Sequence, residues 1–266
     1  MRFCMGGLRS SSMTGPVAHG TSNPMNAAET ELRAPHPRLA GLLYLVPMFL
    51  GPFSMMYVPQ AIVVPGDAAA TAAHLVASEG LFRAGMLSDA VIVLSELALT
   101  SVLYSLLRPA GRTLALTATF ARLAMTVLQA ANLVPQLAAL QLITAGDESL
   151  AAFDVVQRQA LALFALSVHD AGMRVWEILF ALHCALVGVL VFRSGLFPRA
   201  FGPLMGLAAL GYALEGVGHV VAPHMGALFA SVVGITALVG EVPFVLWLVF
   251  RGVGARRLRE DTVVPA

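Results

Sequence analysis

The dominant feature of the sequence is a series of long apolar stretches separated by short polar connections. A helix that crosses a bilayer core of roughly 30 Å needs about 20 mainly apolar residues. Six stretches meet this requirement: Leu39–Val58, Met86–Leu107, Thr113–Val134, Gly172–Phe192, Phe201–Val221 and Ala227–Phe250. The pattern predicts an all-α fold, a polytopic transmembrane helix bundle of about six spans. Pro135 is expected to end the third span and Pro243 to kink the sixth.

Two further segments have a helical pattern that is less certain to cross the membrane. Ala68–Ser78 lies between Asp67, a natural N-cap, and Gly80, a natural stop, so we expect a short helix at the membrane interface. Asp154–Asp170 is also helical in pattern. It either extends the fourth span outward beyond the bilayer or forms a partial seventh membrane segment.

The composition supports a membrane protein. Of the 266 residues, 58% are hydrophobic and 12% are charged, whereas a soluble globular chain has roughly 25% charged residues. Membrane lipids are therefore the expected partner of much of the exterior. The sixteen basic residues are all arginine, which excludes Schiff-base chemistry on a lysine. Nucleic acid is not an expected partner, because no basic stripe is interleaved with aromatic residues.

The chain divides into one apolar domain and two polar tails. Residues 1–35 are rich in Ser, Gly, Pro and Met, so we expect a disordered cytoplasmic tail there, not a signal peptide. Met25 is a candidate start, because the segment before it looks like translated leader sequence. The transmembrane helical domain is expected at 36–252, and a basic cytoplasmic tail at 253–266.

Arginines gather on alternate connections between the spans. One set precedes the first span, fills the second and fourth connections and follows the last span: Arg33, Arg38, Arg108, Arg112, Arg193, Arg199, Arg251, Arg256, Arg257 and Arg259. The odd connections carry only Arg83 and Arg158, beside Asp67, Glu79, Asp147, Glu148 and Asp154. By the positive-inside rule, this predicts a cell-membrane protein with both termini in the cytoplasm.

Ionisable residues occur inside the spans, although a charge at mid-bilayer costs at least about 2.5–3.5 kcal/mol on insertion scales. Counting from the arginine at the inner end of each span places Glu96 roughly 18 Å deep, and Arg122 and Glu241 roughly 15 Å deep. His183 lies at a similar depth. Spans two and three are joined by a tight turn and should be antiparallel neighbours. We therefore expect Arg122 to be neutralised by Glu96, by Glu241 or by both.

A second group of ionisable residues lies further out. Glu177 and Glu215 are roughly 24 Å from the inner face. The others lie at or near the outer rim: Asp89, His169, Asp170, Arg174 and His219. Helical spacing places Asp170, Arg174 and Glu177 on one face, and Glu215 and His219 on another. Lipid cannot solvate such faces, so we predict a polar vestibule, open to the outside and floored by the midplane ion pair.

Each group also has a purely structural interpretation. The Arg122 pair fits helix packing equally well, and His183 fits a hydrogen-bonded core histidine better than a ligand. The side chains that suit zinc are His169, Asp170, Glu215 and His219, but they lack a tight motif such as His-Glu-x-x-His. They are weak metal candidates, and no metal is predicted. The sequence assigns no catalytic residue and no cofactor.

Several short strings resemble a widespread bacterial membrane family known only as domain of unknown function 4386. The most specific are Val64-Pro-Gly-Asp67 and Ala77-Ser-Glu-Gly-Leu-Phe-Arg83. The remainder are Arg38-Leu-Ala-Gly-Leu-Leu-Tyr44, Leu106-Leu-Arg-Pro109, Arg193-Ser-Gly195, Leu210-Gly-Tyr212 and Gly240-Glu241. The resemblance covers roughly His36 to Gly252. It implies a multi-pass bacterial membrane protein and transfers no catalytic residues.

Three functions remain open at this point. The first, which we prefer, is binding or transport of a small polar or amphiphilic ligand through the vestibule, with carboxylates suited to proton coupling. The second is an intramembrane enzyme acting on a lipid-like substrate, metal-assisted through the weak candidates above. The third is a structural, sensory or assembly protein whose charges only specify helix packing.

Overall fold

The computed structural model describes residues 37–144 and 150–252. The helices in chain order are α2 (Pro37–Gly51), the π-helix η1 (Pro52–Tyr57), α3 (Val58–Ile62), α4 (Ala68–Ala77), α5 (Glu79–Leu107), η2 (Arg108–Ala110), α6 (Arg112–Ala131), α7 (Leu133–Thr144), α8 (Val155–Ser194), α9 (Phe201–Val221), η3 (Pro223–Met225) and α10 (Gly226–Phe250). The predicted tails at 1–35 and 253–266 lie outside these residues, as do Asp147 and Glu148.

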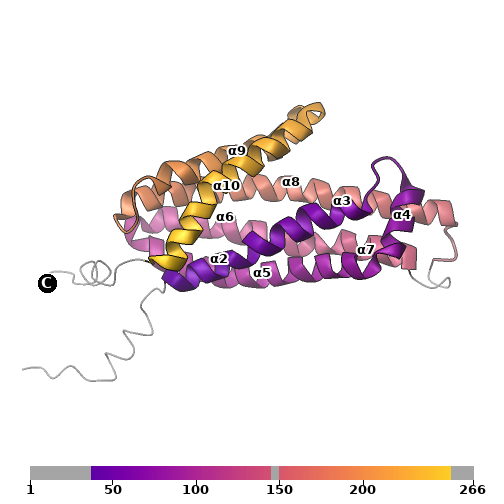
Figure 1. The fold of residues 1–266 in the computed structure, drawn as a ribbon, viewed down its shortest axis with the longest axis horizontal. Helices are drawn as coiled ribbons and strands as arrows, with labels where there is room; N and C mark the ends of the chain where they lie inside the picture. The colour runs from indigo at the N-terminus through magenta and orange to yellow at the C-terminus, as the bar shows by residue number, and fades with distance from the viewer. Residues whose placement is uncertain (1–36, 145–149, 253–266) are drawn as a thin grey trace, which may run out of the picture. The chain divides into compact units, whose positions relative to one another are not determined.

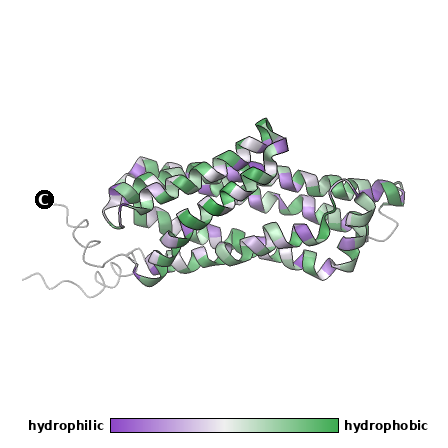
Figure 2. Cartoon of the chain, turned by 45° about the horizontal axis from the view of Figure 1, so that its top comes forward, coloured by the Kyte–Doolittle hydropathy of each residue, from purple (hydrophilic) through white to green (hydrophobic). Residues whose placement is uncertain are grey.

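Six helical segments are long and apolar enough to cross a membrane: Pro37–Ile62, Glu79–Ala110, Arg112–Thr144, Val155–Ser194, Phe201–Val221 and Pro223–Phe250. Apolar residues cover the helices along their length, with polar residues dispersed among them (Figure 2). The described residues contain no strand. The polytopic transmembrane helix bundle predicted from the hydrophobic pattern is therefore confirmed.

The third span is longer than predicted. Helix α6 ends at Ala131, but α7 begins at Leu133 and carries the segment on to Thr144. Pro135 was expected to stop the helix. It instead lies in the first turn of α7, where a proline is tolerated because the amide there has no partner within the helix. Pro135 therefore marks a break between two consecutive helices and not the end of the third span.

The two uncertain segments are both helical. Residues 155–170 form the beginning of the continuous helix α8, so they extend the fourth span and do not form a separate seventh segment. Asp154 caps this helix, because its carboxylate accepts a hydrogen bond from the Gln157 amide. Asp67 caps α4 in the same way. Gly80, the expected stop of α4, instead belongs to α5.

Helix α8 is the centre of the bundle. It packs against α9 on one side and against α6 and α7 on another, while α5 lies beside α2 and α6 (Figure 1). Helix α10 packs on α9 and on α2, and the end of the α9–α10 hairpin near η3 leans away from the other helices (Figures 1 and 2). Small residues allow the closest approach. At Gly202 of α9, a Cβ would lie 2.9 Å from the Gly188 carbonyl oxygen of α8.

Two apolar clusters stabilise the arrangement. The larger one joins α2, α5, α6, α8, α9 and α10 and includes Leu99, Met125, Cys184, Val187 and Phe244. Cys184 is a free, fully buried thiol, in agreement with its apolar surroundings in the sequence. The smaller cluster joins α3, α4, α5, α7 and α8 around Ile62, Leu75 and Leu140. The polar groups described below lie between and within these clusters.

Candidate functional site

A fully buried ion pair joins α5 to α6. The Arg122 Nη2 and Glu96 Oε2 atoms are 2.6 Å apart, and the two residues are 0% and 3% exposed. The helices are antiparallel neighbours because only the short η2 turn separates them. The structure thus brings Arg122 together with Glu96, one of its two expected partners.

The Arg122 guanidinium has two further polar neighbours. Its Nη1 lies 2.8 Å from His183 Nε2 and 3.4 Å from the Tyr44 hydroxyl. His183 Nδ1 lies 2.9 Å from the Ala118 carbonyl oxygen. A carbonyl only accepts and a guanidinium only donates, so Nδ1 carries the hydrogen and Nε2 accepts from Arg122. His183 is therefore a neutral core histidine that holds Arg122 in place.

Glu241 does not take part in this ion pair. Its Oε1 accepts a hydrogen bond of 2.8 Å from the Tyr212 hydroxyl, between α10 and α9. Within the described residues no ion pair joins Glu241 to Arg122, which corrects the expectation that both acids could neutralise the arginine. The depth along a span was similar, but α10 packs on α9 and α2 and not on α6. Counting residues gives depth and not the direction around a helix axis.

Aromatic rings fill the space between Glu241 and the Arg122 group. The Tyr212 ring packs edge-on against Phe180, with centroids 4.7 Å apart, and against Trp176 at 6.2 Å. Phe180 also stacks on His183 at 6.0 Å. The Arg122 guanidinium carbon lies 5.0 Å from the Tyr44 ring centroid, within the range of a cation–π contact. Aromatic side chains therefore lie against the Arg122 guanidinium and between it and Glu241.

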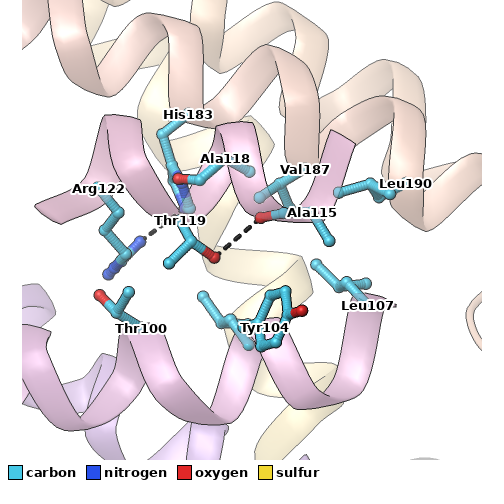
Figure 3. Close-up of a pocket in the computed structure, with 11 residues that line it drawn as sticks. Thr100, Tyr104, Leu107, Ala115, Ala118, Thr119, Arg122, His183, Val187 and Leu190 are labelled. Atoms are coloured by element: carbon cyan, nitrogen blue, oxygen red, sulfur yellow. Dashed lines mark hydrogen bonds between the residues drawn. The ribbon is translucent and has the colours of Figure 1, made fainter. Parts of the chain in front are cut away.

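A small cavity lies beside Arg122. Its volume of about 10 Å³ is enough for one water molecule. Arg122 and Thr100 lie at one end, and Leu107 and Leu190 lie at the end nearer the η2 turn (Figure 3). The wall includes Thr119, whose hydroxyl donates to the Ala115 carbonyl. The cavity thus lies on the side of Arg122 that faces the η2 turn (Figure 3).

Arg174 of α8 forms a second charged group further along the bundle. Its guanidinium contacts Asp170 at 3.1 Å, Glu177 at 2.8 Å, and Glu215 of α9. The Glu177 and Glu215 side chains are 11% and 6% exposed, whereas Asp170 is 63% exposed. When all three carboxylates are ionised, one arginine leaves an excess of two negative charges. The Oε2 atoms of Glu177 and Glu215 are buried without a hydrogen-bond partner among the described residues.

Asp89 lies in a third polar group, formed by α5, η1, α6, α7 and α8. It is 4% exposed, and its carboxylate is surrounded by the side chains of Ser54, Gln129, Gln136 and His169. The Gln136 amide is 3.5 Å from Asp89 Oδ2 and 3.1 Å from His169 Nε2. Asp89 therefore faces neutral polar groups across the bundle and not the other acids of the expected vestibule.

The weak metal candidates are not gathered at one place. Asp170 and Glu215 both contact Arg174, whereas His169 bonds to Asn132 and Gln136. His219 lies against Gly226 at the start of α10. In the described part of the chain, no three His, Cys, Asp or Glu residues form a group that could hold a metal ion. Asp170 and Glu215, the two carboxylates among the zinc candidates, form ion pairs with Arg174 instead.

Several neutral residues of these groups were missed in the sequence. Tyr44 and Tyr212 contact the midplane charges, and Gln129 and Gln136 contact Asp89. A signal was present, because Arg122, Gln129 and Gln136 follow at intervals of seven residues and so lie along one helical face. Neutral amides inside an apolar segment point to a polar interior in the same way as charges do.

Comparisons with known proteins give a family without a described activity. A protein-family model described as "Domain of unknown function (DUF4386)" matches residues 39–252. An "Uncharacterized protein" of Archaeoglobus fulgidus is 32% identical over 99 residues, which are 37% of this chain and 53% of that protein. The chain thus spans about half the length of this relative. No solved structure matches.

Proposed function

We propose a function for this chain, which belongs to the DUF4386 family because that family model matches residues 39–252. The proposal is that the protein binds a small organic cation from the outer side of the membrane and transports it in exchange for protons. The observation that carries this proposal is the excess of carboxylates around Arg174. Two of these carboxylates are buried and have one oxygen atom each without a partner in the described residues.

The chemistry around Arg174 suits an organic cation. Two buried carboxylates supply negative charge, and the Trp176, Phe180 and Tyr212 rings lie beside them along α8 and α9. Aromatic faces attract cations, and the attraction strengthens when the cation is removed from water. A cation bound here would take the place of protons within this acidic group, because like charges so close together disfavour full ionisation. Binding and proton release would therefore be coupled.

The Arg122 group supplies the next step in the proposed path. Arg122 and Glu96 lie beyond the aromatic rings, and the small cavity lies on the side of Arg122 that faces the η2 turn. That end of the bundle carries Arg108, Arg112, Arg193 and Arg199, so the positive-inside rule predicts that it faces the cytoplasm. In this proposal the outer carboxylates select the cation, and the buried ion pair separates them from the inner face.

Uptake by purified protein in liposomes tests the proposal. The probe is radiolabelled tetraethylammonium, whose permanent charge prevents passive diffusion as a neutral amine. Liposomes with an acidic interior should accumulate the probe when they contain the wild-type protein, and a protonophore should abolish the accumulation. Uptake equal to that of empty liposomes contradicts transport.

Matched variants assign the uptake to the proposed site. Glu215→Gln and Glu177→Gln should each remove most of the uptake. Glu79→Gln is the control, because Glu79 forms an exposed pair with Arg83, 2.7 Å apart, far along the chain from α8. Each variant is first checked for the wild-type elution volume and helix content. If well-folded Glu215→Gln and Glu177→Gln proteins transport as the wild type does, the proposed site is wrong.

A further inference from the structure

We propose that the polar group around Asp89 is a sodium-binding site, formed by oxygen atoms of Ser54, Asp89, Gln129 and Gln136. The group is separate from the carboxylates around Arg174, and the inference does not depend on the transported ligand. It rests on three observations: a buried carboxylate without a cationic partner, uncommitted oxygen atoms around it, and irregular helices on two sides.

The Asp89 carboxylate has no cation beside it in the described residues. His169 is the nearest basic side chain, and its Nδ1 lies 3.0 Å from the Asn132 carbonyl oxygen. The carbonyl can only accept, so Nδ1 carries the hydrogen and Nε2 accepts from the Gln136 amide. The hydrogen bonds of the His169 ring thus go to Asn132 and Gln136 and not to the Asp89 carboxylate. A carboxylate that is 4% exposed needs a bound proton or a bound cation, because an isolated buried charge is very costly.

The surroundings favour a metal cation over a proton. Three oxygen atoms have no hydrogen-bond partner among the described residues, Asp89 Oδ1, Gln129 Oε1 and Gln136 Oε1, and the Ser54 hydroxyl lies beside the Asp89 carboxylate. Ser54, Gln129 and Gln136 are 3%, 2% and 6% exposed. A proton on Asp89 would satisfy one of these acceptors, whereas a small cation coordinates several at once. Carboxylate, carbonyl and hydroxyl oxygens are the ligands of hard cations.

The charge of the group selects a monovalent ion. Asp89 contributes one negative charge, and the side chains of Ser54, Gln129 and Gln136 beside it carry none. One sodium ion makes the site neutral, whereas a divalent ion would leave a net charge buried among apolar side chains. The site therefore suits sodium better than calcium or magnesium.

The local backbone is irregular on both sides of Asp89. Ser54 lies in the π-helix η1, where the Val58 amide donates to the Phe53 carbonyl. On the opposite side, α6 breaks at Asn132 before α7 begins. Gly172 of α8 leaves room for this break, because a Cβ there would overlap the Asn132 side chain. π-Helical turns are frequent at functional sites, and interrupted helices commonly supply ion ligands in membrane proteins.

Sodium binding to the detergent-solubilised protein tests the inference. Thermal unfolding is followed in sodium chloride and in choline chloride of equal concentration, and ²²Na⁺ binding is measured by equilibrium dialysis. The wild-type midpoint should rise with sodium concentration and reach a plateau, because a ligand of the folded state stabilises it by mass action. Saturable ²²Na⁺ binding should accompany the rise. A midpoint that is the same in both salts contradicts the inference.

Variants locate the ion. Asp89→Asn should remove saturable ²²Na⁺ binding, and Gln129→Leu should weaken it by about tenfold or more. Asp154→Asn is the control, because Asp154 is an exposed N-cap and asparagine caps equally well. Retained binding in a folded Asp89→Asn protein would overturn the inference. So would a stability that depends on pH through Asp89 but not on sodium, since the site would then hold a proton. These readouts require no transport, so they are independent of the proposed function.

Discussion

Arg122 of α6 and Glu96 of α5 form an ion pair 2.6 Å long, with 1% and 5% of their side-chain surfaces exposed. Each charge offsets the cost of burying the other inside the bundle. Without Glu96, the guanidinium would keep only the neutral His183 and Tyr44 as partners. We therefore expect the pair to act as a unit in stability.

Removing one member of this pair should be far more harmful than removing both. Arg122→Leu leaves Glu96 unpaired in an apolar interior, and we expect a loss of about 3–5 kcal/mol in the free energy of unfolding. The double variant Arg122→Leu, Glu96→Leu should recover most of that loss. Denaturant unfolding of the detergent-solubilised proteins, analysed as a double-mutant cycle, measures the coupling. Additive effects of the two single variants would contradict the pairing.

His183 should contribute to stability as a hydrogen-bonding group. His183→Leu removes the acceptor for Arg122 Nη1 and the donor to the Ala118 carbonyl. Leaving such buried groups unpartnered costs about 1–3 kcal/mol. The control is His74→Leu, because His74 is exposed on α4. Equal unfolding midpoints for the two variants would exclude this role for His183.

The α8–α9 contact should depend on particular glycines. A Cβ at Gly202 would lie 2.7 Å from Phe192 Cβ and 2.9 Å from the Gly188 carbonyl oxygen, so Gly202→Ala must separate the two helices. Gly206, one turn along α9, has no atom within 4 Å of an added Cβ. We expect Gly202→Ala to lower the unfolding midpoint and Gly206→Ala to leave it unchanged or raise it. Thermal unfolding of both variants distinguishes this contact from a general loss of glycine flexibility.

The sequence predicted most of the fold but only part of the site. Apolar length is a strong signal, so the six spans were found, and depth along a span correctly brought Arg122 to the level of Glu96. Counting residues along a span does not show which side of the helix a residue faces. Glu241 was therefore grouped with Arg122, although it bonds to Tyr212. Pro135 was interpreted as a stop because a proline in the first turn of a new helix gives the same local signal. The neighbours of Asp89 were missed because Ser54, Gln129 and Gln136 carry no charge.

The predicted orientation can be measured by labelling single cysteines in a variant that lacks Cys4 and Cys184. Ala152 is exposed just before α8, and Ala200 is exposed just before α9, at the opposite end of the α8 span. The arginine distribution predicts that Ala152 is outside and Ala200 is in the cytoplasm. A membrane-impermeant maleimide should therefore label Ala152→Cys in intact cells and Ala200→Cys only after lysis. The reverse pattern would invert the proposed direction of transport.

The central claim is that the buried carboxylates and aromatic rings of α8 and α9 bind a small organic cation, and Trp176 reports on it directly. The chain has two tryptophans, so Trp247→Phe leaves Trp176 as the single indole, with its ring centroid 4.9 Å from that of Phe180. Titration of this protein with tetraethylammonium should give a saturable change in fluorescence, which Glu215→Gln removes and Glu79→Gln retains. A flat titration of the Trp247→Phe protein, or an unchanged response in folded Glu215→Gln protein, would contradict the account.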